Sequence, residues 1–416
     1  MTEMKRLLAE HGEVTRRYFL KLGAGALAIR GLPLLSAAPA PELAQAVSQL
    51  EYLTPEEKFG NVGRGDPPPH ELSPEQRRAV GLTRDTWQLE VVPDPETDAN
   101  VERPLSKERG TALTWTDLME LAKEHAVSYM HVMTCLNGNQ PLGMGLWEGV
   151  PLRVVVWLAR PVENVRRVFF HGYHHDDPKQ LFESSLPIGR VLEEPPGMLP
   201  VLLCYKLNGE WLSPKRGAPV RMLVPDAYGF KSVKWLTRVV VSNLFHANDT
   251  YARWNNDIDS SLKTFARFVS YPRTARSGQA LPVTGLAQVG VSGLARVQVW
   301  LHPQGAALPP DDPYLAKADW RDAEILPPPD QWGGGLPEGR LPSTPTGFDE
   351  ATGEPRTWPM RFAVAHWAIL MPGMPAGTYD LRCRAIDLNG HAQPMPRPFP
   401  KSGRNAIQRV TVRVEA

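Results

Sequence analysis

Residues 201–241, VLLCYKLNGEWLSPKRGAPVRMLVPDAYGFKSVKWLTRVVV, decide the fold of this protein. Within them, three strand-like apolar runs, at 201–207, 221–224 and 235–241, alternate with segments that contain Gly, Pro and Asn. Short runs of strand-forming residues bounded by such turn-forming residues are typical of β-strands joined by loops. The stretch therefore predicts three strands of a β-rich unit.

The sequence on either side extends this pattern. Upstream, we expect strands at 86–92, 129–134 and 167–170, a helix at 114–123 opened by a threonine cap, and a short apolar helix at 150–159. The composition changes near Ala280, and alternating strands are expected at 282–289, 295–301, 362–369, 379–387 and 406–414, around a Pro/Gly-rich insertion at about 309–359. Spaced strands without helices predict an antiparallel sandwich of immunoglobulin-like type in this second unit.

Composition and charge exclude several classes of protein. Lys and Arg total 46 against 45 Asp and Glu, so the whole chain has no field with which to hold nucleic acid or an anionic membrane. The 42 prolines interrupt helices and disfavour a helical bundle. Of the three cysteines, Cys204 and Cys383 lie in apolar runs and are expected to be buried, whereas Cys135 follows a strand in a polar loop where its thiol can face a cavity.

The N-terminus has the pattern of an export signal. Thr15-Arg16-Arg17-Tyr18-Phe19-Leu20-Lys21-Leu22 precedes a weakly apolar run that is interrupted by Arg30 and followed by small residues. This is the twin-arginine pattern, and the run is too short and too polar to span a membrane. We therefore expect residues 1–40 to be a signal peptide that directs the protein to the periplasm; an uncleaved anchor or a chance basic helix are the alternatives. Export of folded proteins favours a bound redox cofactor.

Two motifs resemble the sulfite oxidase family of molybdopterin-dependent oxidoreductases. Cys135-Leu136-Asn137-Gly138-Asn139, followed by LWEGVPL at 146–152, is similar to the family's cysteine loop and the helix that starts after it. The stretch from 207 to 236 matches the family's cofactor-binding segment almost residue for residue, and 377–394 is similar to its dimerisation domain. The resemblance covers the chain from about Phe59 to its C-terminus.

This resemblance implies an α+β fold, in which a mainly-β molybdopterin-binding domain of sulfite-oxidase type precedes an immunoglobulin-like β-sandwich dimerisation domain. We expect a signal peptide at 1–40, an extended N-terminal wrap at 41–110, the molybdopterin-binding domain at 111–279 and the dimerisation domain at 280–416.

The resemblance also implies Mo-molybdopterin as cofactor, with Cys135 as the protein ligand, because thiolates are soft ligands for such a metal. Arg221 and Lys234 resemble the family's contacts to the phosphate and pterin, with Gly229 and Ser232 supporting them. Taken without the family, two such basic residues would be ordinary surface groups. Two further cofactor-binding candidates are His70 and Asn139.

The substrate pocket departs from the family pattern. Arg64 resembles a substrate-binding arginine, but its spacing is wider than in the family, and a surface arginine is the alternative. Gln140 and Pro141 stand where a second arginine is usually found. Less specific substrate candidates are His171, His174, His175, Tyr251 and Trp254. The three histidines lie in a loop that could recognise substrate, bind a second metal or simply be solvated.

The leading hypothesis is an enzyme that oxidises sulfite or a related sulfur oxyanion by oxygen transfer at molybdenum. The sequence has no Cys-x-x-Cys-His motif and no room for a haem domain, so we expect no haem in this chain and a separate cytochrome c as electron acceptor. We expect a homodimer through the C-terminal domain and no nucleic-acid partner. The alternatives are a periplasmic reductase of S-oxides such as methionine sulfoxide, supplied by a membrane haem donor, a secreted binding or structural protein that has lost the metal, and a homodimeric scaffold.

Overall fold

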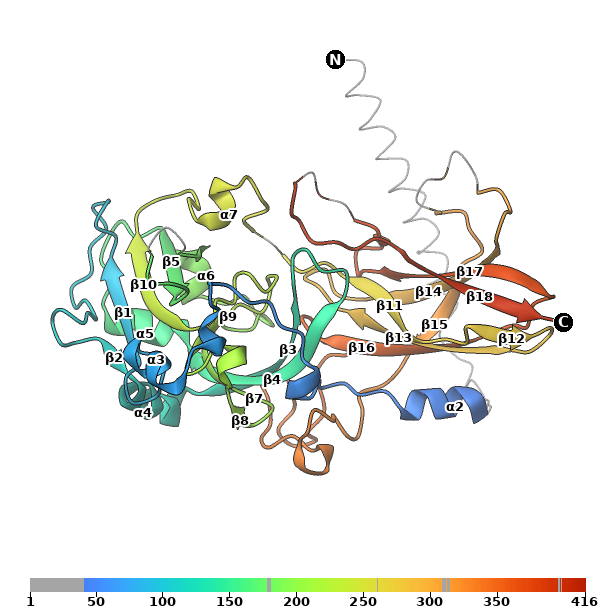
Figure 1. The fold of residues 1–416 in the computed structure, drawn as a ribbon, viewed down its shortest axis with the longest axis horizontal. Helices are drawn as coiled ribbons and strands as arrows, with labels where there is room; N and C mark the ends of the chain where they lie inside the picture. Colours follow the sequence, from blue (N-terminus) through green and yellow to red (C-terminus); the bar gives the residue numbers. More distant parts are fainter. Residues whose placement is uncertain are drawn as a thin grey trace, which may run out of the picture.

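The computed structural model describes residues 41–416 except 178–180, 260, 309–311, 313–314, 396 and 398. This part of the chain forms two β-rich units that lie side by side (Figure 1). The first unit contains two five-stranded sheets, and the second contains one path of eight strands. The signal peptide expected at 1–40 lies outside the described residues.

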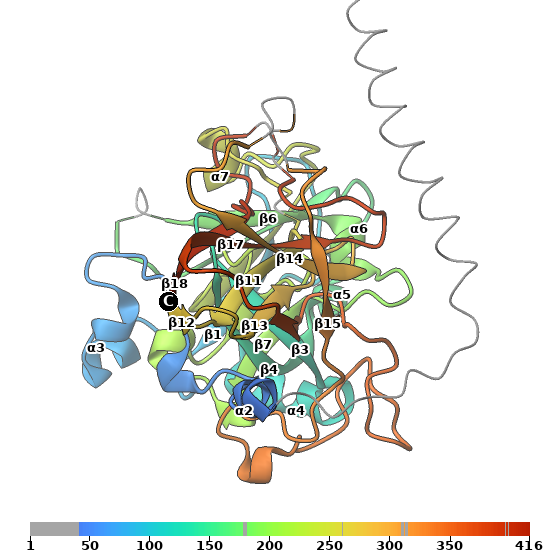
Figure 2. The same ribbon diagram turned by 90° about the vertical axis from the view of Figure 1, so that its right-hand side faces the viewer.

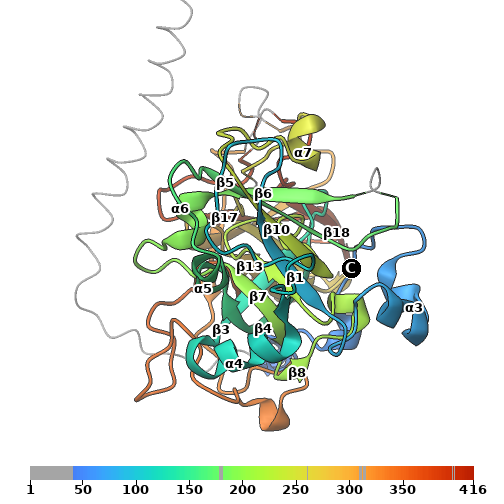
Figure 3. The ribbon, with the colours of Figure 1, turned by 90° about the vertical axis from the view of Figure 1, so that its left-hand side faces the viewer.

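One sheet of the first unit runs in the order β2–β1–β10–β5–β6. Its strands are β1 (Gln88–Pro93), β2 (Leu113–Thr114), β5 (Arg167–Gly172), β6 (Glu183–Pro187) and β10 (Leu236–Ser242). β1 pairs parallel with β10, and the other pairs are antiparallel. Valine and phenylalanine side chains from β1, β5 and β10 are fully buried, which explains why these runs were recognisable as strands. Figure 3 shows this sheet from the outer end of the molecule.

The other sheet of the first unit runs β3–β4–β7–β8, with β9 paired to β7. Its strands are β3 (Val127–Thr134), β4 (Pro141–Pro151), β7 (Leu202–Leu207), β8 (Glu210–Trp211) and β9 (Arg221–Leu223). We did not predict β4, whose sequence contains three glycines. At Gly149, a Cβ atom would lie 2.4 Å from the carbonyl oxygen of Leu203, so glycine allows the close approach of β7.

The described part of the chain also contains short helices. They are α2 (Pro41–Ser48), α3 (Pro74–Ala79), α4 (Trp115–His125), α5 (Leu152–Leu158), α6 (Ile188–Leu192) and α7 (Thr250–Arg253). Of these, α2 lies against the second unit and the others belong to the first. The predicted threonine cap is confirmed, because the side chain of Thr114 accepts a hydrogen bond from the backbone N–H of Asp117. α2 and α3 lie in the segment that we expected to be extended. None of the helices in the described part of the chain is long and apolar enough to cross a membrane.

The second unit follows the order β11–β13–β16–β15–β14–β17–β18–β12. Its strands are β11 (Phe265–Ser270), β12 (Thr274–Arg276), β13 (Leu281–Gln288), β14 (Arg296–Pro303), β15 (Arg321–Ile325), β16 (Val364–Met371), β17 (Gly377–Ile386) and β18 (Gln408–Glu415). β15 pairs with both β14 and β16, and side chains from both halves of the path, including Val283 and Leu381, share one core. All five predicted strands are confirmed; β11, β12 and β15 were missed. Because β11 pairs with β13, this unit begins before the composition change near Ala280 (Figure 2).

The insertion between β15 and β16 folds back onto the first unit, and we call its residues 326–361 the strap. The backbone N–H of Leu53 donates to the carbonyl of Trp332 at 2.8 Å, and Thr346 N–H donates to the carbonyl of Ser128 at 2.7 Å. In Figures 1 and 3 the strap is the orange segment at the lower side of the molecule. It therefore fixes the position of one unit against the other.

Candidate functional site

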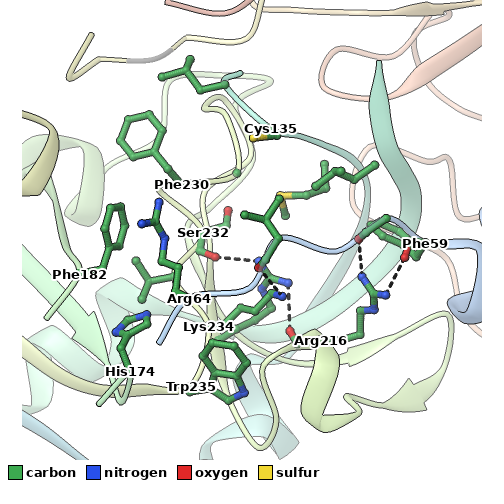
Figure 4. Close-up of a pocket in the computed structure, with 18 of the residues that line it drawn as sticks. Phe59, Arg64, Cys135, His174, Phe182, Arg216, Phe230, Ser232, Lys234 and Trp235 are labelled. Atoms are coloured by element: carbon green, nitrogen blue, oxygen red, sulfur yellow. Dashed lines mark hydrogen bonds between the residues drawn. The ribbon is translucent and has the colours of Figure 1, made fainter. Parts of the chain in front are cut away.

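A cavity of about 700 Å³, partly open to solvent, lies in the first unit. Its walls combine apolar rings with charged and polar groups; among them are Phe59, Phe182, Phe230, Trp235, Arg64, Cys135, His174, Arg216, Arg221, Ser232, Lys234 and Tyr251. Cavities of this mixed character are typical of small-molecule and cofactor sites. In Figure 4, Cys135 and Lys234 lie at opposite ends of the cavity, with Arg64 along one side.

Cys135 directly follows the last residue of β3 and lies at one end of the cavity. The backbone N–H of Gly229 donates to the carbonyl of Thr134 at 2.8 Å, and a Cβ at Gly229 would lie 2.9 Å from the sulfur of Met133. Glycine therefore lets the 225–235 loop lie directly against the end of the strand. Cys135 is a free, partly exposed thiol. Cys204, by contrast, is fully buried, and burial raises the pKa of its thiol to about 12.

Arg64 projects into the cavity beside Cys135. Its guanidinium carbon lies 3.4 Å from the centroid of the Phe182 ring (Figure 4). Burial lowers the pKa of Arg64, whereas Tyr251, by charge and by a side-chain hydrogen bond, and Cys135, by charge, favour its protonated form. A partly desolvated cation is therefore available next to the only cysteine that faces this cavity among the described residues.

Lys234 lies at the other end, among further cations. Its ammonium donates to the side-chain oxygen of Asn61 at 2.5 Å and to the carbonyls of Val62 and Lys215 at 3.1 and 2.9 Å. Burial first, and then the charges of Arg221, Arg216, Lys215 and Arg64, lower its pKa to about 6. Such a concentration of positive charge favours binding of an anion.

Gly217 makes room for the Lys234 side chain. It has a φ of +103° and a Cβ there would lie 2.8 Å from Cβ of Lys234. Few residues other than glycine adopt this backbone conformation, and none with a side chain would fit the space.

Arg221 organises the loops around the cavity. It is 4% exposed and donates to the carbonyls of Ser232, Arg216 and Met222 at 2.7, 3.0 and 3.4 Å. Ser232 in turn accepts, through its hydroxyl, a hydrogen bond from the backbone N–H of Val224 at 3.0 Å. Arg221 thus lines the cavity as expected, but its hydrogen bonds hold the protein main chain together.

Our sequence analysis missed Arg216. Its guanidinium donates to the carbonyls of Phe59 and Gly60, each at 2.7 Å (Figure 4). These bonds attach the segment that carries Arg64 to the wall of the cavity. Arg216 directly precedes the Gly217-Ala218-Pro219 part of the recognised motif, which was the only signal for it in the sequence.

The predicted residues divide into those that reach the cavity and those that do not. Cys135, Arg64, Arg221, Gly229, Ser232, Lys234, His174 and Tyr251 line it. His174 is 2% exposed, and burial, followed by the charge of Arg64, lowers its pKa to about 4. His70 lies behind the wall, with its ring parallel to that of Trp235 at 6.1 Å.

Besides His70, four predicted residues lie away from the cavity. His171 is on β5, and burial lowers its pKa to about 4. His175 accepts a hydrogen bond from the backbone N–H of Asp177, and Trp254 is 56% exposed. Asn139 lines a different pocket, because the chain turns after Cys135, where Gly138 N–H donates to the Cys135 carbonyl at 2.8 Å.

These residues fit a pterin-bound metal better than a metal held by protein side chains alone. In the described part of the chain there is no group of three or more His, Cys, Asp or Glu residues that could hold an ion. A single thiol at one end of the cavity and cations at the other suit a metal whose remaining ligands come from an anionic cofactor. The buried Nδ1 atom of His174 has no hydrogen-bond partner within the described chain and is a further polar group at the cavity.

Comparison with known proteins identifies this combination. The oxidoreductase molybdopterin binding domain matches residues 78–249. Sulfite oxidase of Gallus gallus is 29% identical over 268 residues, 60% of this chain and 50% of that protein. The protein-methionine-sulfoxide reductase catalytic subunit MsrP of Campylobacter jejuni is 26% identical over 279 residues, 64% of this chain and 85% of that protein. This chain thus spans about half the length of the sulfite oxidase that it matches.

A solved structure shares the fold of both units. The crystal structure of the sulfane dehydrogenase SoxCD from Paracoccus pantotrophus superimposes with a TM-score of 0.54 and 18% identity, covering 94% of this chain and 96% of that one. The fold, the cavity and the matched domain define a molybdopterin-binding oxidoreductase. The matched domain and the similar sulfite oxidases support a molybdopterin oxidoreductase of the sulfite oxidase family.

Lys234 makes the stability of the cofactor-free protein depend on pH. Its pKa falls from 10.5 in a free lysine to about 6 in the folded protein, so between these values folding releases a proton. The unfolding free energy is therefore expected to rise with pH across this window. Lys234 contributes to this slope the equivalent of up to about one proton bound in the unfolded but not in the folded state. Denaturant titrations between pH 6 and 10 measure the slope.

Replacement of the lysine isolates its contribution. In the cofactor-free Lys234→Met variant, the pH dependence of the unfolding free energy is expected to decrease by the equivalent of up to about one proton. Lys123 is exposed and pairs with Glu120, so Lys123→Met should leave this pH dependence unchanged. Equal slopes in the wild type and Lys234→Met would contradict the prediction.

Proposed function

We propose that the chain oxidises sulfite or a related sulfur oxyanion by oxygen transfer and passes the electrons to a cytochrome c. The observation that carries the proposal is the position of Arg64, a partly desolvated cation that lines the same cavity as Cys135. A cation at this position attracts an anionic substrate and holds it in line with the reacting centre.

Bound molybdopterin supplies two-electron redox chemistry and oxygen-atom transfer, and the protein supplies the orientation. The thiolate of Cys135 would be the protein ligand, and Lys234 would compensate the charge of the cofactor's phosphate. Arg64 would hold the substrate oxyanion, with Tyr251 keeping the guanidinium in place. The aromatic rings of Phe182 and Phe230 limit the access of water, which strengthens these charge interactions.

A second candidate is the reduction of an S-oxide such as methionine sulfoxide. Two observations favour it: one arginine and several aromatic rings flank Cys135, and the similarity to a methionine-sulfoxide reductase subunit spans most of that protein. A neutral, partly apolar S-oxide needs fewer cations than a doubly charged oxyanion. In this case electrons would enter from a membrane haem donor.

The two functions can be separated with purified, molybdenum-loaded protein. Sulfite with cytochrome c as acceptor tests the oxidation, and methionine sulfoxide with a reduced viologen as donor tests the reduction. Turnover of sulfite and no turnover of the sulfoxide is the expected result, and the reverse would establish the second candidate. Molybdenum near one atom per chain would exclude a binding or structural protein that has lost the metal.

Arg64 provides the first mutational test. Arg64→Gln is expected to raise KM for sulfite about 10- to 100-fold, because a hydrogen bond to a charged group contributes roughly 1.5–3 kcal/mol. Molybdenum content should not change, because Arg64 is assigned to the substrate and not to the cofactor. Arg253→Gln, which changes an arginine of nearby α7 that does not line the cavity, is the matched control. An unchanged KM in Arg64→Gln would remove the assignment.

We also propose an assembly and a location for the protein. The second unit would be an immunoglobulin-like dimerisation domain, supported by its two strand layers around one core. The twin-arginine motif at residues 15–22 supports export to the periplasm. Analytical ultracentrifugation and cell fractionation test these two points, with a dimer in the periplasmic fraction as the expected result.

A further inference from the structure

A second pocket lies where the two units meet. Asn139, at the tip of the loop that follows Cys135, forms one side of it. Lys263 and Arg267, before and within β11, and the 402–409 segment form the rest. None of the described residues that line this pocket also lines the cavity at Cys135. In Figure 1 the loop between β3 and β4 extends toward β11, which brings these segments together.

The pocket carries an excess of positive charge. Five cationic side chains line it, and the residues are Lys263, Arg267, Arg397, Arg404 and Arg409. Arg397 is neutralised by Asp257 at 2.7 Å, and Arg409 lies 3.7 Å from Asp380. No Asp or Glu is among the described lining residues, and Asp257, which pairs with Arg397, is the carboxylate whose charge also acts on Lys263. This excess of cations, of which Lys263 is buried, Arg267 half-buried and Arg404 exposed, favours an anionic ligand.

Two buried polar groups complete the site. Lys263 is 5% exposed, and its ammonium donates to the carbonyl of Gly403 at 2.8 Å, which leaves further N–H groups available. Asn405 is 7% exposed, and its side-chain oxygen accepts a hydrogen bond from the backbone N–H of Met395 at 3.2 Å. The Nδ2 group of Asn405 has no partner within the described chain. Buried N–H donors are normally satisfied, so an acceptor is expected here.

We propose that this junction pocket is a binding site for a tetrahedral oxyanion of the sulfate and phosphate class. Lys263, Arg267 and Arg404 provide the charge, and Asn405 provides a neutral donor that helps to fix the orientation. The site is separate from the one assigned to cofactor and substrate. Through Asn139 it contacts the loop that begins at Cys135, so occupancy of the pocket restrains that loop.

The test measures binding of sulfate to the molybdenum-loaded protein. Sulfate is titrated at constant ionic strength, with chloride as the balancing anion, and the thermal unfolding midpoint is followed. We expect the midpoint to rise with sulfate in the wild type. The Arg267→Gln/Arg404→Gln double variant is expected to bind sulfate at least about tenfold more weakly, because two charge-assisted contacts are lost.

Two further variants test the unpartnered donor of the pocket and provide a control outside it. Asn405→Asp retains the oxygen that accepts from Met395 but replaces the unpartnered donor by a negative charge, so sulfate binding should be lost. Arg276→Gln changes an exposed arginine of β12 outside the pocket and should leave the titration unchanged. If the double variant fails to fold, Arg404→Gln alone gives the same comparison when sulfate binding is measured by calorimetric titration. This single variant removes only an exposed side chain.

The proposal is overturned if all variants respond to sulfate like the wild type, or if chloride alone produces the same shift. Either result would mean an adventitious ion only.

Discussion

Replacement of Cys135 by serine is expected to reduce turnover by at least about a hundredfold. Loss of a residue that only supports a metal ligand reduces activity by up to about a hundredfold, and loss of the ligand itself should cost at least as much. The hydroxyl is a harder and much less acidic ligand than the thiol, so it cannot supply the soft anionic donor that the metal requires. The unfolding free energy should change little, because the Cys135 side chain is partly exposed at the cavity. Steady-state kinetics and elemental analysis for molybdenum measure the effect.

Cys383→Ala is the matched control for this experiment. Cys383 is fully buried in β17, in the core of the second unit, and burial raises the pKa of its thiol. The alanine variant is expected to lose roughly 1 kcal/mol of stability through the small cavity that it creates, and to retain its turnover per folded molecule. Wild-type turnover in Cys135→Ser would show that Cys135 is not the metal ligand, and loss of turnover in Cys383→Ala would show that the effect is not specific to Cys135.

Arg221→Met is expected to lower the unfolding free energy by roughly 3 kcal/mol or more. The substitution removes three hydrogen bonds from a charged donor and leaves the carbonyls of Ser232 and Arg216 without that partner in a buried site. Burial itself lowers the pKa of Arg221 to about 10, so part of this loss is offset by removal of a desolvated charge. Denaturant unfolding with an unchanged m-value measures the difference.

The effect on the cofactor distinguishes Arg221 from other buried arginines. Arg382 in β17 is 5% exposed and pairs with Asp380 at 2.8 Å, far along the chain from the cavity. Arg382→Met should be destabilising to a similar degree, because it leaves a buried carboxylate behind. Only Arg221→Met should also reduce the molybdenum bound per folded chain. Equal molybdenum contents in the two variants would contradict the role of Arg221 at the cavity.

The sequence allowed prediction of the strands and helices whose buried residues follow an uninterrupted pattern. The apolar runs of β1, β7 and β10 and the capped helix α4 were found because burial pattern and turn residues agree there. β4 was missed because glycine weakens a strand prediction. Its glycines are instead required by neighbours, as at Gly145, where a Cβ would lie 2.2 Å from a methyl group of Leu207. Such requirements arise from tertiary contacts that local sequence does not contain.

The contrast between local sequence pattern and tertiary contact also decides which residues of the site could be predicted. Cys135 and Lys234 belong to motifs with family-specific spacing, and both reach the cavity. Arg216, Phe182 and Trp235 reach it only because of the way distant segments pack. Asn139 shows the opposite case, because it is four positions after Cys135 yet faces another pocket. Adjacency in the chain is therefore a poor guide wherever a tight turn intervenes.

The strap has a consequence for the order in which a nascent chain completes its cavity. The N-terminal segment that leads to Phe59 and Arg64 is fastened at Leu53 by a hydrogen bond to Trp332, and Tyr52 donates to the carbonyl of Pro327 at 3.1 Å. During synthesis these partners emerge long after the segment that they hold. These two bonds of the segment therefore form only after most of the polypeptide has left the ribosome, later than its bonds to Arg216.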